Sequence, residues 1–491
     1  MKKYQFYANG RWYDPSSGQW FDSYNPTTGE AWAKLPRCNE MDVETAVSAA
    51  HKAFANGPWG KMNATERGRV LQRMGDAVVA NADRLGDIET TDNGKRTVDI
   101  TPGLQTWLVD SFYYYAGLAD KIEGSLIPVD TPNILNYTKH EPFGAVACIT
   151  AWNSPLLIAI WKIAPALAAG NTVVIKPSEH ASASTLALME VLETADLPPG
   201  VVNVVTGFGV ETGAPLIHHP DIRLVSFTGG IRGGSLAAAA AAQQVKPVIM
   251  ELGGKSPQLV LEDADPELAA NGVATGIFPP SGQSCVAGSR LIVHRRLHDE
   301  IVERLSKIVG GARFGDPRLP KTHIGPIAHK HHFDCILADI ERAKAEGAKL
   351  VAGGKAVQPE TAPNGWFIEP TIFTNVTPDM RLATEEVFGP VLAVIPFDTE
   401  EEAIRIANDS NYGLAAGIWT RDSARAIRIA DQIQAGTVYV NNYFGSAAHS
   451  PVGGYKQSGY GRENGIEGMK AFLQTKSVWL STMPEMGNPF A

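Results

Sequence analysis

The stretch that decides the fold is FGAVACITAWNSPLLIAIWKIAPALAAGNTVVIKPSE, at residues 143–179. Two short apolar runs, 145–149 and 172–175, flank a segment at 156–168 with the length and apolar content of a buried helix. The turn-forming residues Ala-Gly-Asn at 169–171 separate that helix from the second run. A strand, a helix and another strand in this order predict a parallel β-α-β unit.

The same alternation continues to about residue 262. We expect strands at 201–205, 224–227 and 247–250, and helices at 182–194, 210–218 and 235–242. The turn signals LPPG at 197–200 and HHPD at 218–221 separate these segments. This pattern predicts an α/β fold with a doubly wound parallel sheet, in which ligands bind at the carboxyl ends of the strands.

The remaining sequence predicts a second domain and two protruding strands. Before residue 143 the pattern is mostly helical, with helices expected at 42–55, 64–81 and 104–120. After residue 262 a second α/β domain is expected, with helices at 266–275, 297–309, 329–346 and 400–408 and strands at 291–293, 390–396 and 437–440. Residues 126–139 and 476–481 are expected to form strands that leave both domains.

The composition excludes several classes of function. Lys and Arg number 43 against 52 Asp and Glu, so the charge of −9 argues against nucleic acid or an anionic membrane as the main partner. The start of the chain, MKKYQFYANG, lacks an apolar signal segment, and the longest apolar stretch, 155–169, is too short to cross a bilayer. The four cysteines are scattered and form no CxxC pair, so neither a disulfide framework nor a zinc site is expected. We therefore expect a cytoplasmic protein without a bound metal.

Cys285, in PPSGQSCVAGSR, is the cysteine best placed for chemistry. Its small, polar neighbours predict an accessible loop, where a thiolate can act as a nucleophile. On the local sequence alone, an ordinary exposed cysteine explains it equally well. Cys148 lies in a predicted apolar strand and is expected to be inert, and Cys38 and Cys335 are expected to be structural or incidental.

Polar residues follow three of the predicted strands. Glu251, in MELGGKSP, is a candidate general base, although a charge that caps the turn explains it more simply. Asn153, in TAWNSP, can donate to an oxyanion or form an Asx turn. Lys176 and Glu179, in VVIKPSE, follow the second strand of the predicted fold, where a Glu can bind ribose hydroxyls. A Glu at the N-terminus of a helix, where it interacts favourably with the helix dipole, explains Glu179 as well.

Glycines and histidines give weaker signals. TGFGVETG at 206–213 misses the dinucleotide fingerprint by one residue. FTGGIRGG at 227–234 follows a strand and opens a helix, so its amides suit a pyrophosphate. The histidines of HKHH at 329–332 do not share one helical face, so we expect a solvated helix start rather than a metal site.

Together, in this order and spacing, the motifs resemble the aldehyde dehydrogenase superfamily, of the NAD(P)+-dependent, hydrolytic type. The resemblance runs from YNPTTGE at 24–30 to GYKQSGYGRENG at 454–465. It includes AWNSP, KPSE, FTGG, ELGGKSP, GQSC and EEVFGP at the family's relative positions. The implied reaction is oxidation of an aldehyde to its acid, through a thiohemiacetal and then a thioester on a cysteine.

The resemblance implies a role for each matching position. Cys285 corresponds to the nucleophile, Asn153 and the Cys285 backbone N–H to an oxyanion hole, and Glu251 to the general base. Lys162 and Glu463 correspond to a buried pair that relays protons. The implied cofactor contacts are Trp152, Lys176, Glu179, Gly209, Phe227, Thr228, Gly229, Gly230, Leu252, Glu386 and Phe388. NAD is favoured over NADP because Glu179 would repel a 2′-phosphate, although Lys176 leaves room for NADP.

The resemblance also implies a subunit of three parts. We expect an NAD-binding domain at 1–120 and 143–253 and a catalytic domain at 254–453. An oligomerisation arm of strands, at 121–142 and 470–487, is expected to join subunits into a homodimer or homotetramer.

Some positions depart from the family's pattern. Pro279 and Pro280 stand where an aromatic residue and Asn are frequent, which stiffens the cysteine loop. His332 stands where a Gln is common, and Ser154 and Val452 make the pocket less aromatic. We therefore expect a substrate larger than acetaldehyde in a roomier pocket. Its expected walls are Trp107, Trp161, Tyr443 and Phe444.

Two other functions fit the same scaffold. A CoA-acylating aldehyde dehydrogenase would pass the acyl group to a thiol, but such relatives generally lack the Glu of ELGGKSP. A non-catalytic structural protein would be expected to lose the nucleophile or the base, whereas Cys285, Glu251 and Asn153 are all present.

Overall fold

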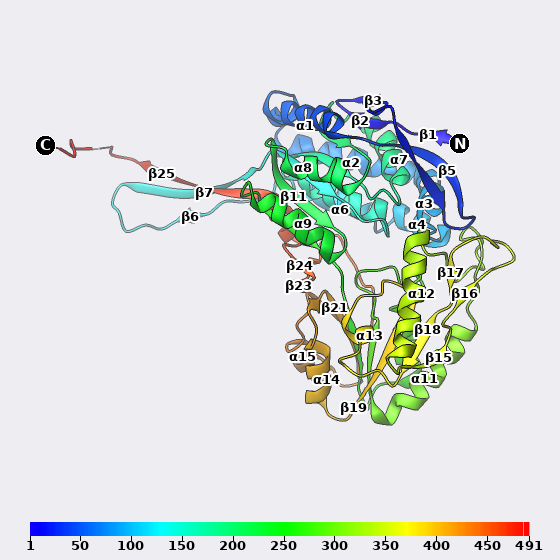
Figure 1. The fold of residues 1–491 in the computed structure, drawn as a ribbon. Helices are drawn as coiled ribbons and strands as arrows, with labels where there is room; N and C mark the ends of the chain where they lie inside the picture. Colours follow the sequence, from blue (N-terminus) through cyan, green and yellow to red (C-terminus); the bar gives the residue numbers. More distant parts are fainter. Residues whose placement is uncertain (485, 491) are drawn as a thin grey trace.

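The computed structural model describes residues 1–484 and 486–490, which form two α/β bodies and a long β-arm (Figure 1). Each body is a largely parallel sheet with helices on both faces, so the predicted α/β class is confirmed. In Figure 1 the first body lies at the top, the second lies at the bottom, and the arm extends to the left. Among the described helices, none is both long and apolar enough to cross a bilayer.

The first sheet has eight strands in the order β24-β12-β11-β8-β9-β10-β2-β3. Its five parallel strands are β8 (Ala145–Ile149), β9 (Thr172–Lys176), β10 (Val202–Val204), β11 (Ile222–Thr228) and β12 (Val248–Glu251). The chain moves outward from β8 to β10, and β11 then returns to the other side of β8. The order therefore reverses beside β8, and a ligand crevice belongs at the carboxyl ends of β8 and β11.

Helices cover both faces of this sheet because each has an apolar side. One face carries α2 (Ala64–Ala80), α3 (Ala82–Asn93), α6 (Pro155–Ala168) and α7 (Ala183–Leu192). The other face carries α1 (Glu40–Ala55), α8 (Ala214–His218) and α9 (Ile231–Ala242). Since α6 is buried on nearly every side, its sequence is an almost continuous apolar run, and the Lys162 inside it requires a partner.

The second sheet has seven strands in the order β15-β18-β19-β14-β13-β21-β22. They are β15 (Lys349–Ala352), β18 (Thr371–Thr374), β19 (Val391–Phe397), β14 (Arg290–His294), β13 (Pro257–Val260), β21 (Ala415–Trp419) and β22 (Thr437–Val440). One face packs on α10 (Pro266–Thr275) and α11 (Arg295–Gly310), and the other on α12 (Lys330–Ala345), α14 (Glu400–Asn408) and α15 (Ser423–Ala430). The remaining short elements are β16 (Ala356–Val357), β17 (Phe367–Ile368), β20 (Tyr412–Gly413), β23 (Tyr455–Lys456), β24 (Gly459–Tyr460), α13 (Arg381–Thr384) and α16 (Gly465–Lys470).

The N-terminal region differs from the mostly helical pattern that the sequence predicts. Its first 36 residues form β1 (Lys2–Lys3), β2 (Phe6–Ala8), β3 (Arg11–Tyr13), β4 (Trp20–Asn25) and β5 (Glu30–Pro36). Asn9 and Gly10 both adopt positive φ between β2 and β3, which is the Asn-Gly turn that closes a tight hairpin. This hairpin joins the first sheet, because Tyr7 pairs with Val204 of β10.

The single helix predicted at 104–120 is wrong. The chain forms α4 (Thr97–Gln105), breaks at residues 106–109, and continues as α5 (Asp110–Leu118). The Thr106 backbone leaves the helical conformation, with φ −134° and ψ −107°, and its N–H donates to the Gly103 carbonyl at 3.2 Å instead of the Pro102 carbonyl that a continuing helix would use. The aromatic residues of 112–115 keep their helical spacing, but on a separate helix.

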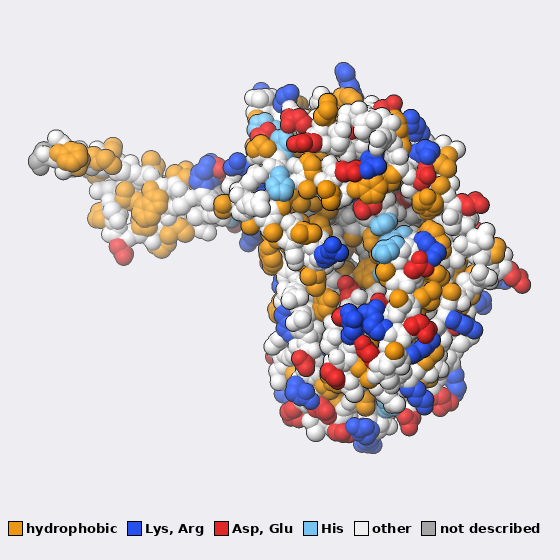
Figure 2. Space-filling model, viewed as in Figure 1, with side chains coloured by type: hydrophobic (Ala, Val, Ile, Leu, Met, Phe, Trp, Pro, Cys, Tyr) orange, Lys and Arg blue, Asp and Glu red, His pale blue; other side chains and the backbone are white. Residues whose placement is uncertain are grey.

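The arm is a three-stranded antiparallel sheet. β7 (Ile134–Pro142) lies between β6 (Leu126–Ile127) and β25 (Leu473–Ser481), and it pairs with β25 along the whole length of both. Large apolar side chains gather on the arm in Figure 2, and Leu126, Trp479 and Leu480 are at least half exposed. Residue 485, within the predicted arm segment 470–487, lies outside the described residues.

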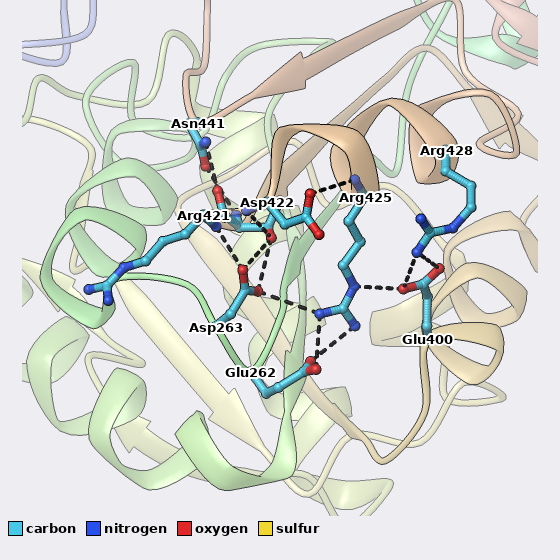
Figure 3. A network of polar contacts seen from close by, with 9 residues as sticks. Glu262, Asp263, Glu400, Arg421, Asp422, Arg425, Arg428 and Asn441 are labelled. Carbon is cyan, nitrogen blue, oxygen red and sulfur yellow. Dashed lines mark hydrogen bonds and ion pairs between the residues drawn. The ribbon is translucent and has the colours of Figure 1, made fainter.

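Charged side chains tie together the carboxyl ends of the second sheet, at the tip far from the first body (Figure 3). The Arg425 guanidinium of α15 donates to both oxygens of Glu262, which follows β13, and its Nε donates to Glu400 at 2.6 Å. Arg428 also donates to Glu400, at 3.1 Å. This network closes the far end of the sheet and leaves its amino ends facing the first body.

The Arg425 network is expected to stabilise the second body. Since the Arg425 side chain is only 16% exposed, Arg425→Ala leaves the Glu262 carboxylate unpaired and Glu400 with Arg428 alone, and it should lower the free energy of unfolding by about 1–3 kcal/mol. Urea unfolding followed by tryptophan fluorescence measures this loss. Arg421→Ala, which removes only the exposed ion pair to Asp265, is the control and should cost less than about 0.5 kcal/mol. Equal losses in the two variants would contradict this account.

Candidate active site

A short connection between the two sheets carries the first candidate catalytic residue. β12 ends at Glu251 and β13 begins at Pro257, so residues 252–256 cross from one sheet to the other. A Cβ on Gly253 would collide with the Glu386 carboxylate, and a Cβ on Gly254 would collide with the backbone oxygen of Cys285. These two glycines therefore let Glu386 and the cysteine loop close onto the crossing.

Cys285 lies in a turn between α10 and β14 and is partly accessible. Burial, followed by the nearby carboxylates of Glu251 and Glu386, raises the pKa of this thiol to about 12. The backbone N–H groups of Val286 and of Cys285 itself oppose this rise. The thiol is therefore protonated near neutral pH and must lose its proton before it can attack a substrate.

Asn153 brings the first body to the cysteine loop. It follows β8, and its Nδ2 donates to the backbone oxygen of Gln283 at 3.1 Å, two residues before Cys285. The Gln283 side chain fixes the loop in turn, because its Oε1 accepts from the backbone N–H of Ala328 at 2.9 Å. An amide has two N–H donors, so one can hold the loop while the other remains for a ligand.

Glu251, Lys162 and Glu463 form a buried charged group behind the cysteine. Lys162 Nζ donates to Glu463 at 2.5 Å and to the Ser226 hydroxyl at 2.7 Å. Burial and the charge of Glu463 raise the pKa of Glu251 well above its ordinary value, against the opposing charges of Lys162 and Arg462. Lys162 and Glu463 are thus joined by a hydrogen bond, whereas Glu251 senses the charges of both and its Oε1 makes no hydrogen bond to the described residues.

The predicted cofactor residues gather at the carboxyl ends of the parallel strands. Lys176 ends β9, and its buried Nζ donates to the Pro177 carbonyl at 3.0 Å and lies 3.8 Å from Glu179. Phe227 and Thr228 end β11, and Leu252 follows β12. Gly209 begins a π-helical turn at Gly209–Gly213, between β10 and α8.

The turn between β11 and α9 fits a pyrophosphate. Gly230 is the N-cap of α9, and within the described part of the chain nothing lies within 4 Å of where its Cβ would be. Gly229 donates to the Glu251 carbonyl at 3.1 Å, which holds the turn against β12. The Thr228 hydroxyl is buried and makes no hydrogen bond to the described residues, so it is available to a ligand. A helix N-terminus with free amides and an unused hydroxyl suits phosphate oxygens.

Glu386 and Phe388 line the crevice from the second body. Glu386 accepts from the Gly254 N–H at 2.8 Å, and burial raises its pKa to about 7. Phe388 has φ +56° and presents its ring edge-on to Trp152 at 5.3 Å between centroids. These side chains therefore face the strand ends that carry Trp152 and Asn153.

The histidines at 329–332 are not simply a solvated helix start. His329 is the N-cap of α12, and its ring stacks on that of His180 from the first body at 3.7 Å. His329 and His332 also pack on Trp152, and burial lowers the pKa of both. Histidine side chains rim the hollow between the two bodies in Figure 2. In the sequence, the one indication that His180 lies near the crevice is its position directly after Glu179, a predicted cofactor contact.

Three further polar residues reach the Asn153 loop. Glu89, Asn93 and Lys95 lie at the end of α3 and in the turn after it, and the sequence reasoning did not identify them. No local motif marks them, since polar residues buried on a helix have no periodic signature.

The aldehyde dehydrogenase family matches residues 12–478. The chain belongs to this family. It is therefore an oxidoreductase that acts on aldehydes, and the resemblance inferred from the motifs is confirmed. Aldehyde dehydrogenase 1A1 of Gallus gallus is 43% identical over 485 residues, which cover 97% of this chain and 93% of that protein.

Two solved structures extend the comparison. An NAD+ complex of an aldehyde dehydrogenase from Bacillus cereus is 41% identical with a TM-score of 0.95, and the match covers 98% of this chain and 97% of that one. Betaine aldehyde dehydrogenase from Staphylococcus aureus, in complex with NAD+, is 38% identical with a TM-score of 0.97, over 99% of this chain and 96% of that one. The fold of this aldehyde dehydrogenase is thus that of the solved members.

The raised pKa of Cys285 predicts how its reactivity depends on pH. Far below a pKa of about 12, the thiolate fraction should rise about tenfold for each pH unit. Alkylation by iodoacetamide, followed by mass spectrometry of the Cys285 peptide, should therefore accelerate steadily from pH 7 to pH 9. The peptide of Cys148, which is fully buried, controls for unfolding. A rate that levels off below pH 8 would contradict the assigned environment.

Proposed function

We propose that this aldehyde dehydrogenase oxidises its substrate to the carboxylic acid through a thioester on Cys285. The contact between Asn153 Nδ2 and the Gln283 backbone oxygen carries the proposal, because it brings an amide donor from the first body to the cysteine loop of the second. A nucleophile beside an oxyanion donor is the arrangement that acyl transfer requires.

NAD is the cofactor, as in the two solved relatives that hold it. The proposed contacts are Lys176 and Glu179 for the adenosine ribose, Thr228, Gly229 and Gly230 for the pyrophosphate, and Glu386 and Phe388 for the nicotinamide ribose and ring. Glu179 disfavours a 2′-phosphate, whereas Lys176 beside it leaves NADP as a second cofactor. When bound, NAD+ accepts the hydride.

The chain's own residues supply the remaining steps. The Cys285 thiol first loses its proton to solvent, its sulfur then bonds to the carbonyl carbon, and the carbonyl oxygen becomes an oxyanion. The free N–H of Asn153 and the Cys285 amide stabilise that oxyanion, and one such donor is typically worth about 3 kcal/mol. The tetrahedral carbon then releases hydride, because the oxygen's electrons re-form the carbonyl and leave a thioester.

Glu251 is the proposed general base for hydrolysis. Its raised pKa makes it a strong proton acceptor once it is ionised, and Glu463 and Lys162 are proposed to pass the proton on. Water that loses a proton to Glu251 attacks the thioester carbon, the C–S bond breaks, and the acid leaves with the cysteine restored as a thiolate.

The residues around the cysteine favour a bulky aldehyde. The Tyr443 hydroxyl donates to the Val286 carbonyl at 2.8 Å, beside Cys285, and its ring packs on Tyr439 and Phe444. Ser154 and Val452 are small. We propose an aromatic or long-chain substrate that contacts these rings.

The remaining assignments follow the arrangement of the sheets. We assign cofactor binding to residues 1–120 and 143–253 and catalysis to residues 254–453. The exposed apolar side chains of the arm, at 121–142 and 470–487, are proposed to pack against a second copy in a homodimer or homotetramer. The cytoplasm remains the proposed location, since the four cysteines are free.

Two substitutions separate the proposed chemical steps. Cys285→Ala should abolish NADH production while NAD+ binding, measured by fluorescence quenching, persists. Glu251→Gln should still give a burst of NADH but then stall, because the thioester forms and is not hydrolysed. Stopped-flow absorbance at the NADH band measures both phases. Normal steady turnover by Glu251→Gln would contradict its role as the base.

The pocket predicts a size preference. Since each buried methylene is worth about 0.8 kcal/mol, hexanal and benzaldehyde should exceed acetaldehyde in kcat/KM by at least about tenfold. Val452→Phe should narrow the pocket and reduce this ratio, with little effect on acetaldehyde itself. A wild-type preference for acetaldehyde would refute the proposed substrate class.

A further inference from the structure

We propose that Asn93, together with Glu89 and Lys95, positions the Asn153 amide for oxyanion binding. These three positioning residues, which we call the α3 clamp, lie at the end of α3 and touch no reacting atom. The inference rests on the proposed function, in which Asn153 stabilises the oxyanion. It adds the part of the chain that holds Asn153 in place.

Asn93 fixes the backbone on both sides of Asn153. It is only 3% exposed, and its Nδ2 donates to the carbonyl oxygens of Trp152, at 3.3 Å, and Asn153, at 3.4 Å. Those carbonyls belong to the peptide groups before and after the Asn153 Cα. Since a side chain leaves the Cα in a direction set by these two peptide planes, Asn93 constrains where the Asn153 amide points.

Glu89 holds the start of the helix that follows. Ser154 is the N-cap of α6, but its hydroxyl accepts no hydrogen bond from the N–H groups of that helix. The fully buried Glu89 supplies the cap instead, because its Oε2 accepts from the Leu156 N–H at 3.0 Å. The first turn of α6 is thereby fixed just three residues after Asn153.

Lys95 binds Ser154, which lies between the carbonyls that Asn93 holds and the Leu156 N–H that Glu89 holds. Its Nζ donates to the Ser154 hydroxyl at 2.6 Å and lies 3.9 Å from Glu89. The Asn93 Oδ1 in turn accepts from the Lys95 backbone N–H at 3.0 Å, which ties the clamp residues to one another. Residues 152, 153 and 154 therefore each accept a hydrogen bond from the clamp, and residue 156 donates one to it.

The turn at Gly94, between Asn93 and Lys95, packs against a proline that binds the partner of Asn153. Gly94 has φ +80°, and a Cβ there would lie 2.5 Å from the Pro326 ring, so no other residue fits without strain. Gln283 Nε2 donates to the Pro326 carbonyl at 3.3 Å, and Gln283 is the residue whose backbone oxygen accepts from Asn153. The clamp thus contacts the loop of Asn153 directly, and it is linked to the loop of Cys285 through Pro326 and Gln283.

A double-mutant cycle tests whether Asn93 acts through Asn153. Asn93→Ala should slow the burst of NADH by about 10- to 100-fold, because a displaced amide no longer meets the oxyanion. NAD+ affinity should stay within about twofold of wild type, because the clamp makes no hydrogen bond to Lys176, Thr228 or Glu386, which are proposed to hold most of the cofactor. In an Asn153→Ala background, Asn93→Ala should slow the burst by less than about twofold further, since the amide it positions is already absent.

Conservative variants of the clamp sharpen the test. Glu89→Gln keeps an oxygen acceptor for the Leu156 N–H and should retain much of the burst, whereas Glu89→Ala should not. If Asn93→Ala does not fold, Lys95→Met is measured in the same two backgrounds. The inference predicts that the Asn153→Ala background largely abolishes the effect of Lys95→Met too.

Two results would overturn the inference in different ways. Equal slowing by Asn93→Ala, or by Lys95→Met, with and without Asn153 would show that the clamp supports the fold and does not position the amide. A wild-type burst in Asn153→Ala alone would remove the oxyanion role itself, and the clamp's role with it. The first result leaves the proposed function intact, whereas the second does not.

Discussion

The whole site depends on how closely two protein segments can approach the crossing between the sheets. Gly253 and Gly254 leave no room for side chains, because the Glu386 carboxylate and the Cys285 backbone occupy the space that a Cβ would need. Glu251 ends β12 two residues before Gly253, and the cysteine loop contacts Gly254 from the second body. A side chain at Gly254 would push the Cys285 backbone away, and a side chain at Gly253 would displace the Glu386 carboxylate.

The geometry explains why two separate bodies are needed. The parallel strands of the first sheet present Asn153, Lys176 and Thr228 at their carboxyl ends, where polar groups and free amides can meet a ligand. The second sheet turns its amino ends toward the same crevice and carries its charged network at the opposite tip (Figure 3). In the proposed function, one body provides the cofactor surface and the other provides the nucleophile, and the crossing lies between them.

Much of this arrangement could be predicted from the sequence. The helices at 266–275 and 400–408 and the strand at 437–440 lie where the apolar spacing places them, because their buried faces are made of side chains with a clear period. The motifs around Glu251 and Cys285 identified the family. The first 36 residues escaped detection because their short strands carry few apolar repeats. The break at 106–109 begins with the non-helical backbone of Thr106, which the apolar spacing does not reveal.

The contacts between distant segments could not be predicted in the same way. Asn93 lies 60 positions before Asn153 in the chain, and His180 is far in sequence from His329, so no local pattern connects them. A buried polar residue is hydrogen-bonded to particular partner atoms, so its position follows no apolar periodicity along the chain. Their roles become visible only when the partner's position is known.

The central claim is that the substrate becomes covalently attached to one particular sulfur. The most direct measurement is peptide mass spectrometry after acid quenching within the first turnover, with NAD+ and an aldehyde present. The account predicts an added mass equal to the acyl group on the peptide that contains Cys285. An acyl group found on Cys38, Cys148 or Cys335, or turnover without any acylated peptide, would contradict it.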